Sequence, residues 1–529
     1  MADAVHVIAA GAALPPGGVA AVGNKAWNLA RMAAAGLPVP PAFVLPTSWC
    51  RDRRAGRIDD AALAAALADG IAALERATGL VFGSPRRPLL VSVRSGAAVS
   101  MPGMMETVLD VGMNAAVAEG MTRLTGNPRL AWDCYRRFVA GYAEVVEGLP
   151  AAGFDDQLSA ALIAAEAENE RELDHRALRA LTHAMLERRA GSRGAFPEDA
   201  RAQLRHAVAA VFRSWDAPKA ATYRRLHGID DEAGTAVTVQ AMVFGNAGGA
   251  SGAGVAFSRN PATGLRELYL DFAWGGQGED VVAGRRAVAG TERLNRRLPG
   301  VVAQLETTAR TLETLFGDAQ DFEFTLQEGV LWLLQTRRAK RTPWAALRIA
   351  VDLVEEGLIG PADALRLVDG IETQAVLRTR FVQAGPVLAR AQVASLGVAS
   401  GAIALDAATA GRMAAEGPVI LVRHDIATED IAGLASATGV LTATGGRTSH
   451  AAVVARQLGK VCLVGCADLT IDLGARTCRI GERSFAEGDT IALDGEAGTV
   501  HAGQPDVLAE RPIRELTALA SYRRLLDTA

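Results

Sequence analysis

Short apolar segments alternate with helical segments from about residue 386 to residue 503, and this alternation constrains the fold more than any other feature. The segments VILVRH, GVLTAT, VCLVGC and TIALDG are typical of buried strands. Strands that alternate with helices form a domain in which helices pack on a sheet. We therefore predict a compact α/β domain over 386–503, followed by a proline-marked tail over 504–529.

The remaining residues require further domains, because 529 residues exceed what one hydrophobic core usually serves. Residues 1–340 mix strands, helices and glycine turns, and we assign them to one domain with a helical insert at about 113–218. Residues 341–385 begin with two amphipathic helices, which predict a stiff linker rather than a flexible tether. The expected fold class is α/β and multidomain.

The composition argues against several classes of function. A net charge of -4, with 55 basic and 59 acidic residues interspersed, supplies no basic stripe for nucleic acid. The chain contains no run of about 18 apolar residues and no basic, apolar leader, so we expect no membrane span and a cytoplasmic location. The five cysteines are scattered without a C-x-x-C pair, which indicates buried apolar residues rather than disulfides or metal ligands.

The segment AQDFEFTLQEGVLWLLQTR, residues 319–337, predicts a β-hairpin with a three-residue loop at 327–329. In the expected register Asp321 lies opposite Gln335, and Glu323 lies opposite Leu333. One face then carries Asp321, Glu323, Gln335 and Arg337, and the other carries Phe322, Phe324, Leu326, Trp332 and Leu334. Carboxylate and amide oxygens suit Mg2+, and Arg337 could take a phosphate oxygen. The alternative is a solvated sheet face with an ordinary ion pair.

A glycine-rich loop, GNAGGASG, separates strands expected at 236–244 and 253–258, and we expect a flexible hairpin flap. Its glycines lack Cβ atoms, so that backbone N–H groups can close over an anion; they include Gly248, Gly249 and Gly252. Lys25 and Arg94 add two cations that could contact phosphates, although each is more often a surface charge. Together with the acidic hairpin they predict a nucleotide site.

One histidine, His450, stands in TATGGRTSHAAVVARQLGK between a glycine turn and an alanine-rich helix that we expect to stop at Gly459. Thr448 or Ser449 could cap that helix. In the first helical turn the dipole disfavours imidazolium, and the free N–H groups can stabilise an attached phosphoryl group. A lone histidine in such a place is more often structural, so the nucleotide site is needed to favour a chemical role.

The whole set of segments resembles the pyruvate phosphate dikinase family over nearly all of the chain. The resemblance rests on PLLVSVRSGAAVSMPGMMETVLDVG, NPRLAWDCYRRF, GTAVTVQAMVFGNAGGASGAGVAFSRNPATG, QGEDVVAG, QDFEFTLQEGVLWLLQTR and GGRTSHAAVVARQLGK. Related phosphoenolpyruvate synthases usually carry Cys before the reactive histidine, so that Ser449 and the MPGMM segment favour the dikinase branch.

This resemblance implies an ATP-grasp domain and a swivelling phosphohistidine domain, with pivots near 385–386 and 504–505. It implies that Lys25 and Arg94 hold ATP phosphates, and that Mg2+ is bound by Asp321, Glu323 and Gln335. Arg337, with Arg136, would hold the γ-phosphate or inorganic phosphate. In the family the counterpart of His450 attacks the β-phosphate of ATP and releases AMP. Inorganic phosphate then takes the terminal phosphoryl group as pyrophosphate, and phosphohistidine remains.

Three departures from the family pattern bear on this expectation. Family members continue into a (β/α)8 barrel that binds phosphoenolpyruvate and pyruvate, whereas this sequence ends at Ala529. Thr444 stands where dikinases have an arginine before the two glycines, and Arg447 follows the glycines as in the synthases. Asn24 replaces a glycine that is usual beside the lysine.

We therefore expect a dikinase-like phosphotransferase that makes phospho-His450 from ATP and phosphate and passes it to an acceptor on another polypeptide. Pyruvate on a separate barrel protein is the leading acceptor, and a homodimer is compatible with the sequence. A second hypothesis is a dikinase repurposed for another small-molecule acceptor, as in rifampicin phosphotransferase or L-glutamine kinase. A third is a non-catalytic ATP-binding regulatory protein, which retention of His450 and the acidic hairpin disfavours.

Overall fold

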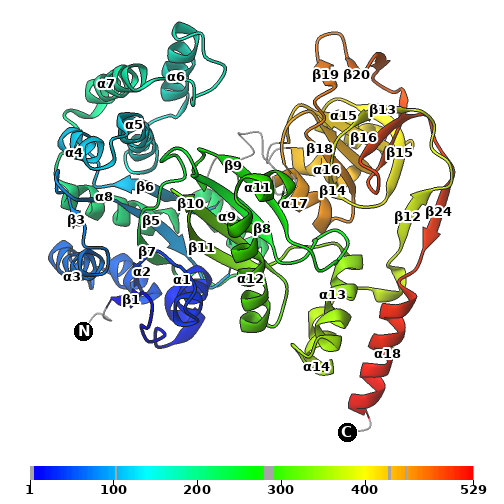
Figure 1. The fold of residues 1–529 in the computed structure, drawn as a ribbon, viewed down its shortest axis with the longest axis horizontal. Helices are drawn as coiled ribbons and strands as arrows, with labels where there is room; N and C mark the ends of the chain where they lie inside the picture. Colours follow the sequence, from blue (N-terminus) through cyan, green and yellow to red (C-terminus); the bar gives the residue numbers. More distant parts are fainter. Residues whose placement is uncertain are drawn as a thin grey trace. The chain divides into compact units, whose positions relative to one another are not determined.

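The computed structural model describes residues 5–99, 101, 104–278, 291–426, 430–446 and 450–527. It divides into two compact units, of which unit 1 holds Met1–Gly249 with Val330–Thr336, and unit 2 holds Ala250–Gly329 with Arg337–Ala529 (Figure 1). Both units combine sheets with helices, so the chain is an α/β multidomain protein, as the sequence predicts. The domain boundaries expected from the sequence stay predictions.

Unit 1 is built on an antiparallel sheet whose strands come from distant parts of the sequence. The strand order is β1 (His6–Ile8), β2 (Ala42–Leu45), β7 (Ala236–Ala241), β5 (Val91–Gly96) and β6 (Thr107–Val111). Every residue of β2 and β7 is buried, which fits their apolar and β-branched composition. A minor pair, β3 (Val81–Phe82) with β4 (Pro88–Leu89), completes the strands of this part.

Helices make up the rest of unit 1, and asparagine or aspartate begins several of them. They are α1 (Gly18–Ala34), α2 (Thr47–Arg54), α3 (Asp60–Thr78), α4 (Ala115–Thr125), α5 (Pro128–Val145), α6 (Ala152–Ala164), α7 (His175–Arg193), α8 (Ala200–Ser214) and α9 (Pro218–Leu226). The α5 helix starts where Asn127 accepts a hydrogen bond from the Leu130 N–H and Pro128 follows it. Its buried face carries large apolar and aromatic residues at three- and four-residue spacing, namely Trp132, Tyr135, Phe138, Val139 and Tyr142.

A second sheet has the strand order β11 (Val330–Arg338), β10 (Gln320–Gln327), β8 (Gly252–Phe257) and β9 (Tyr269–Trp274); β8, β9 and β10 belong to unit 2, and most of β11 is counted with unit 1. The predicted hairpin flap is wrong, because β7 and β8 belong to different sheets. Each pairs with strands remote in sequence, β7 with β2 and β5, and β8 with β9 and β10. Two helices of this region, α11 (Thr291–Arg297) and α12 (Pro299–Phe316), precede β10.

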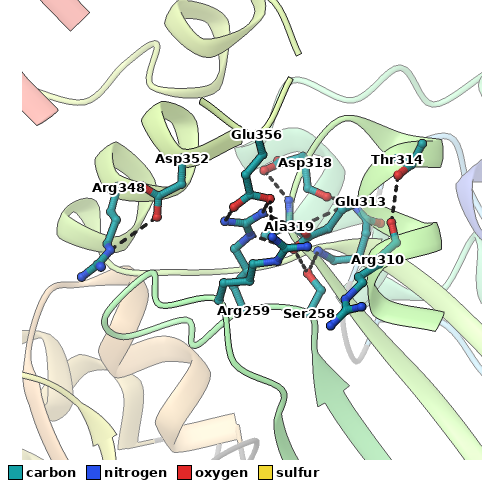
Figure 2. A network of polar contacts seen from close by, with 12 residues as sticks. Ser258, Arg259, Arg310, Glu313, Thr314, Asp318, Ala319, Arg348, Asp352 and Glu356 are labelled. Atoms are coloured by element: carbon teal, nitrogen blue, oxygen red, sulfur yellow. Dashed lines mark hydrogen bonds and ion pairs between the residues drawn. The ribbon is translucent and has the colours of Figure 1, made fainter. Parts of the chain in front are cut away.

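Two helices follow the second sheet where the sequence predicts the linker, α13 (Pro343–Glu355) and α14 (Pro361–Leu367). A buried ion-pair network fastens α13 to α12 (Figure 2). The Arg259 guanidinium is fully buried and donates to Glu313 of α12 and to Glu356 at the end of α13, at 2.9 to 3.0 Å. The C-terminal parts of α12 and α13 are therefore both held by the Arg259 guanidinium.

The C-terminal part of unit 2 is a mixed eight-stranded sheet with short helices. Its strands are β13 (Val387–Arg390), β23 (Thr499–Ala502), β22 (Thr490–Asp494), β15 (Val398–Ala404), β16 (Val419–Arg423), β17 (Gly439–Thr442), β18 (Val461–Val464) and β14 (Gln392–Ser395). Its helices are α15 (Ala407–Met413), α16 (Ile431–Ser436) and α17 (His450–Gln457). The four apolar segments that predicted strands form β16, β17, β18 and β22, which confirms that expectation.

Smaller elements surround this sheet. They are the 3-10 helix η1 (Thr373–Ala375), the ribbon β12 (Arg378–Phe381) with β24 (Val507–Glu510), the three strands β19 (Leu469–Asp472), β20 (Thr477–Ile480) and β21 (Arg483–Ala486), and α18 (Ile513–Asp527). Leu519 of α18 is buried with Leu347 and Val351 of α13, so that α18 packs on the linker helices. Among the described residues, no helix combines the length and the apolar character needed to cross a bilayer.

Candidate active site

The turn that precedes His450 lies at the carboxyl ends of parallel strands. Strands β15, β16, β17 and β18 pair in parallel, and residues 443–446 follow β17. The Thr444 N–H donates to the His424 carbonyl (2.9 Å), and the Gly465 N–H donates to the Thr444 carbonyl (3.3 Å). The turn is thus held between the ends of β16 and β18, the edge at which ligands meet open α/β sheets.

Two glycines let this turn pass close to its neighbour. Gly445 has φ 95°, a region that L-residues rarely adopt. A Cβ on Gly465 would meet the Gly445 carbonyl oxygen at 2.9 Å. His450 is the first residue of α17, which ends before Gly459 as the sequence predicts. The predicted capping residues Thr448 and Ser449 and the His450 side chain lie outside the described residues.

A row of acidic residues crosses the second sheet of unit 2. Glu323 of β10 pairs with Val255 of β8, which pairs in turn with Asp271 of β9. Directly paired residues of antiparallel strands point to the same face. Asp321 lies two residues from Glu323 and therefore shares that face. We call the face defined by Asp271, Asp321 and Glu323 the acidic face.

Sequence reasoning missed Asp271. Its signal is a lone carboxylate within the apolar strand YLDFAW, and this carboxylate is fully buried. A buried ionised carboxylate is costly unless partners stabilise it, so an acid at such a position calls for a cation nearby.

Asp321 and Arg337 form an ion pair on the acidic face. The Arg337 Nε–H donates to both carboxylate oxygens of Asp321, at 2.8 and 2.9 Å. Burial raises the pKa of Asp321 to about 6, although the Arg337 guanidinium acts in the opposite direction. A cation near this carboxylate is therefore favourable, because it offsets the loss of hydration.

The predicted hairpin has the right polar face in the wrong register. The backbone bond from Ala339 N–H to the Ala319 carbonyl (2.9 Å) places Asp321 opposite Arg337 rather than opposite Gln335. The turn has two residues, Glu328 and Gly329, rather than three, so that Gln327 faces Val330. These two pairings differ by one position, which means that β11 holds one extra residue, a β-bulge, between the turn and Ala339. Glu328 and Gly329 both take left-handed φ values, 52° and 83°, which is the geometry of a tight type I′ hairpin turn.

The other predicted metal ligands lie on the same two strands. Glu323 is half-buried on β10, and Gln335 is buried on β11. No cluster of three or more His, Cys, Asp or Glu side chains suited to a metal occurs among the described residues. That census counts no amide oxygens, so the predicted set of two carboxylates and Gln335 remains a prediction.

Lys25 and Arg94 are carried by segments that touch within unit 1. The α1 helix has a kink at Gly23 (φ 74°), and beyond it the Asn24 N–H donates to the Ala97 carbonyl (3.0 Å). A Cβ on Gly23 would lie 2.1 Å from the Gly96 carbonyl oxygen. The kink therefore lets the Lys25 segment approach the end of β5, the strand that carries Arg94.

The glycine-rich loop is fastened at its base and open at its tip. Asn127, which also caps α5, donates from Nδ2 to the Ala247 carbonyl (2.9 Å), and Asn246 donates to the Asp133 carboxylate (2.8 Å). Gly248 and Gly249 are exposed and have positive φ values of 108° and 39°. Gly252 lies instead inside β8, where a Cβ would meet the Phe272 ring at 2.2 Å.

Arg136, predicted to contact phosphate, is buried in an ion-pair network of unit 1. It pairs with Asp133 (2.7 Å) and with Glu170, and Arg137 pairs with the same two carboxylates. These contacts give Arg136 a structural partner on α5 and leave its phosphate role a prediction.

Comparisons with known proteins place these elements in a family. Residues 53–290 match the family described as pyruvate phosphate dikinase, AMP/ATP-binding domain, and residues 415–498 match the PEP-utilising enzyme, mobile domain. The chain is 41% identical over 513 residues to pyruvate, phosphate dikinase from Clostridium symbiosum, which covers 96% of this chain and 58% of that protein.

Two further pyruvate, phosphate dikinases match the chain at a similar identity and coverage. Pyruvate, phosphate dikinase 2 from Zea mays is 42% identical over 490 residues, covering 91% of this chain and 55% of its own length. Pyruvate, phosphate dikinase from Rhizobium meliloti (strain 1021) is 41% identical over 504 residues, covering 92% of this chain and 56% of its own length. This sequence thus spans little more than half the length of the relatives it matches. With both its nucleotide-binding and mobile segments matched, the chain belongs to the pyruvate phosphate dikinase family.

Proposed function

We propose that the protein uses ATP and inorganic phosphate to phosphorylate His450, releasing AMP and pyrophosphate. The observation that carries the proposal is the combination of two sites in one chain. One is a histidine at the start of a helix, after a glycine turn at the ends of parallel strands. The other is a sheet with a buried carboxylate, a second carboxylate beside it and an arginine.

The proposed reaction has two balanced steps on the histidine. A ring nitrogen of His450 attacks the β-phosphorus of ATP, the bond from that phosphorus to the oxygen it shares with the α-phosphate breaks, and AMP leaves. Inorganic phosphate then attacks the terminal phosphorus of the pyrophosphoryl-histidine and leaves as pyrophosphate, so that one phosphoryl group remains on His450. The first step transfers a pyrophosphoryl group and the second a phosphoryl group, and in both, positioning and charge neutralisation provide most of the catalysis.

Each group of residues has a physical task in this proposal. The first turn of α17 offers free backbone N–H groups to the phosphoryl oxygens, and its dipole keeps the imidazole neutral. Lys25, Arg94 and the exposed N–H groups around Gly248 and Gly249 would hold ATP phosphates, and Arg337 would hold the γ-phosphate or inorganic phosphate. Arg136 would assist there, and Gly252 would keep the end of the loop close to β9.

The donor set of the acidic face fits a magnesium ion. Asp321, Glu323 and Gln335 provide hard oxygen ligands, and the raised pKa of the buried Asp321 is a cost that a bound cation would remove. When bound, Mg2+ neutralises phosphate charge and orients the β- and γ-phosphates. The chain itself thus supplies two carboxylates and one amide oxygen as ligands, all on one polar face of the sheet.

The phosphoryl acceptor would be bound by another domain or by a partner protein. Relatives are named pyruvate, phosphate dikinases, and we propose pyruvate as the acceptor, with phosphoenolpyruvate as the product. The acceptor domain would be a phosphoenolpyruvate/pyruvate-binding barrel, brought as a separate protein or domain.

Isotope labelling tests the proposed function directly. The protein is incubated with Mg2+, phosphate and ATP labelled at the β-phosphate, and the chain is then analysed for label that is acid-labile and base-stable. We expect label on the wild-type chain and none on His450→Ala. Label that persists in His450→Ala would refute the assigned nucleophile, and an unlabelled wild-type chain would refute the phosphotransferase itself.

A further inference from the structure

A single arginine on the histidine-bearing helix is buried against the ATP-binding sheet of unit 2. Arg456 lies six residues after His450 on α17 and is 0% exposed. Its Nη1–H donates to the Ala394 carbonyl of β14 (2.8 Å), and its guanidinium lies over the Phe257 ring of β8, 5.3 Å from the centroid. The first contact is within its own sheet, and the second reaches the sheet that carries the acidic face.

Phe257 stands on the acidic face itself. It pairs with Asp321 on one side and with Tyr269 on the other, one row along from the Glu323, Val255 and Asp271 row. A cation over the face of an aromatic ring is attracted by the ring quadrupole, and more strongly where water is excluded. Arg456 therefore reaches the middle of the acidic face.

Two further contacts flank the arginine. The Tyr269 hydroxyl donates to the Val393 carbonyl of β14 (2.7 Å). The Lys340 ammonium donates to the Gln457 side-chain oxygen, next to Arg456 on α17 (3.2 Å). Residues of α17 and β14 thus contact β8, β9 and the segment after β11, and the buried Arg456 lies among these contacts.

The surrounding charges suit this burial. Burial lowers the pKa of Arg456, and the Asp271 and Asp321 carboxylates together with the Tyr269 hydroxyl act against that shift. A guanidinium retains its charge in protein interiors, so the acidic residues offset the loss of its hydration. Asp271, which sequence reasoning missed, receives a role in the same arrangement: it provides negative charge for an arginine brought by another element.

We propose that Arg456 is a positioning residue that seats the His450 helix on the acidic face, in the arrangement in which His450 is phosphorylated. The inference rests on the proposed function, because a carrier histidine that serves two sites must leave the first one. The contact between Arg456 and Phe257 exists only while α17 is seated. Its partners on the sheet, Phe257 and Asp271, are separate from the phosphate-binding residues proposed above.

The test compares Arg456→Met with the wild-type chain and with Arg479→Met, a matched variant at an exposed position of β20. Misplacement of a reacting group by about 1 Å costs about 100-fold, so we expect the labelling rate of His450 to fall by about that factor in Arg456→Met. The dissociation constant for ATP should stay unchanged. The radius of gyration from X-ray scattering, without nucleotide, should increase.

A second pair of variants separates seating from simple loss of structure. Asp271→Asn keeps the side-chain volume and removes the charge, and like Arg456→Met it should slow the labelling of His450. The double variant with Arg456→Met should be no slower than Arg456→Met alone, because both changes break one interaction. Arg456→Lys should restore part of the rate, since it keeps the charge and loses the planar stacking.

The outcomes decide between the two proposals. An Arg456→Met chain with unchanged labelling or with unchanged scattering overturns the seating role, and additive effects in the double variant do the same. If the wild-type chain takes no label, the proposed function fails, and the scattering comparison alone decides whether Arg456 seats α17.

Discussion

Asn246 in the glycine-rich loop donates a hydrogen bond from its side-chain amide to the carboxylate of Asp133 on α5, with Nδ2 and Oδ2 2.8 Å apart. Both residues are buried. Burial alone would raise the pKa of Asp133, but Arg137 and Arg136 hold it far below its usual range. The acceptor is thus a permanent charge, and the loop base is fixed by a charge-assisted bond.

The first prediction concerns this bond. Asn246→Ala should release the base of the loop and raise the KM for ATP in the labelling of His450 several-fold, with a smaller effect on kcat. Hydrogen bonds to charged groups contribute about 1.5–3 kcal/mol, so the thermal midpoint should also fall. Asn169→Ala, in an exposed loop where Asn169 contacts Glu172, is the control. An unchanged KM in Asn246→Ala would show that the loop needs no anchor here.

The second prediction concerns the buried Arg259 network of Figure 2. Arg259→Met leaves the carboxylates of Glu313 and Glu356 without their shared cation, and removing one partner of a buried pair costs about 3–5 kcal/mol. Arg266→Met is a matched control, because Arg266 also contacts Glu356 (3.4 Å) but its side chain is 52% exposed. Such exposed pairs contribute about 0–1 kcal/mol. Calorimetry of unit 2 unfolding measures the loss of stability in each variant. An equal loss of stability in Arg259→Met and Arg266→Met would contradict the prediction.

The third prediction concerns the kink in α1. Gly23 and Gly36 have nearly equal φ values, 74° and 77°, but only Gly23 has a neighbour at the Cβ position, the Gly96 carbonyl oxygen. Gly23→Ala therefore introduces a steric clash that Gly36→Ala does not. Gly23 also has ψ 161°, a region essentially restricted to glycine, so its substitution adds backbone strain. Overpacking costs about 1–3 kcal/mol, so Gly23→Ala should be the less stable by at least that amount. It should also weaken ATP binding, because the Lys25 segment is displaced from β5; equal stabilities and affinities would exclude the close approach.

The sequence predicts structure well where the relationship is local. The alternation in residues 319–337 identified the polar face of the hairpin, because side chains on a strand alternate whatever the strand pairs with. The predicted register is wrong for two reasons. Glu328 adopts a left-handed φ, which shortens the turn to two residues, and β11 holds one extra residue between the turn and Ala339. A glutamate does not by itself indicate a left-handed φ, and a β-bulge has no clear signal in the sequence.

Longer-range relationships were not predictable in the same way. The expected flap failed because β7 and β8 each join strands far along the chain, although only ten residues separate them. Asp271 was missed because it lies two strands from Glu323, with Val255 of β8 paired to both. The order of strands in a sheet has no local signal in the sequence. The start of α17 at His450 was predictable, since a glycine turn and a stop glycine bound the helix.

The fourth prediction is a pH dependence at the start of α15. Although burial acts to raise it, bonds from the Thr409 N–H and Arg476 lower the pKa of Asp406 from 3.8 to about 2. A lowered pKa stabilises the fold above the unfolded value, and this stability is lost as the pH falls from about 4 to about 2. Asp406→Asn keeps a capping residue but loses the ion pair with Arg476 (2.8 Å). The pair is partly exposed, so the difference should stay below about 1 kcal/mol at pH 7.

The measurement for this fourth prediction is a series of thermal unfolding scans between pH 7 and pH 2.5. The gap between the wild-type protein and Asp406→Asn should be constant above pH 5, shrink through pH 4 to 3 and become smaller at high salt. A gap that stays the same at pH 3 as at pH 7 would mean that capping, rather than charge, accounts for the difference.

The fifth prediction concerns metal dependence. Glu323→Gln keeps the size of a proposed Mg2+ ligand on the acidic face but removes its charge. Loss of an outer-shell partner already costs about 10–100-fold in metal affinity, so loss of a direct ligand should raise the Mg2+ concentration for half-maximal labelling of His450 by at least that factor. Glu328→Gln is the matched control, five residues along in the exposed turn of the same hairpin. Its metal dependence should equal that of the wild-type chain.

Glu323 and Glu328 belong to the same hairpin but have different surroundings. Glu323 half-buries its carboxylate beside Asp321 on the acidic face, whereas Glu328 points its side chain from a turn into solvent. Both substitutions change the net charge equally, so a general electrostatic effect on nucleotide binding would shift both curves together. A shift confined to Glu323→Gln assigns the metal to the acidic face. Equal shifts, or a Glu323→Gln curve that overlays the wild-type one, would place the metal ligands elsewhere and leave Asp321 and Arg337 as a structural ion pair.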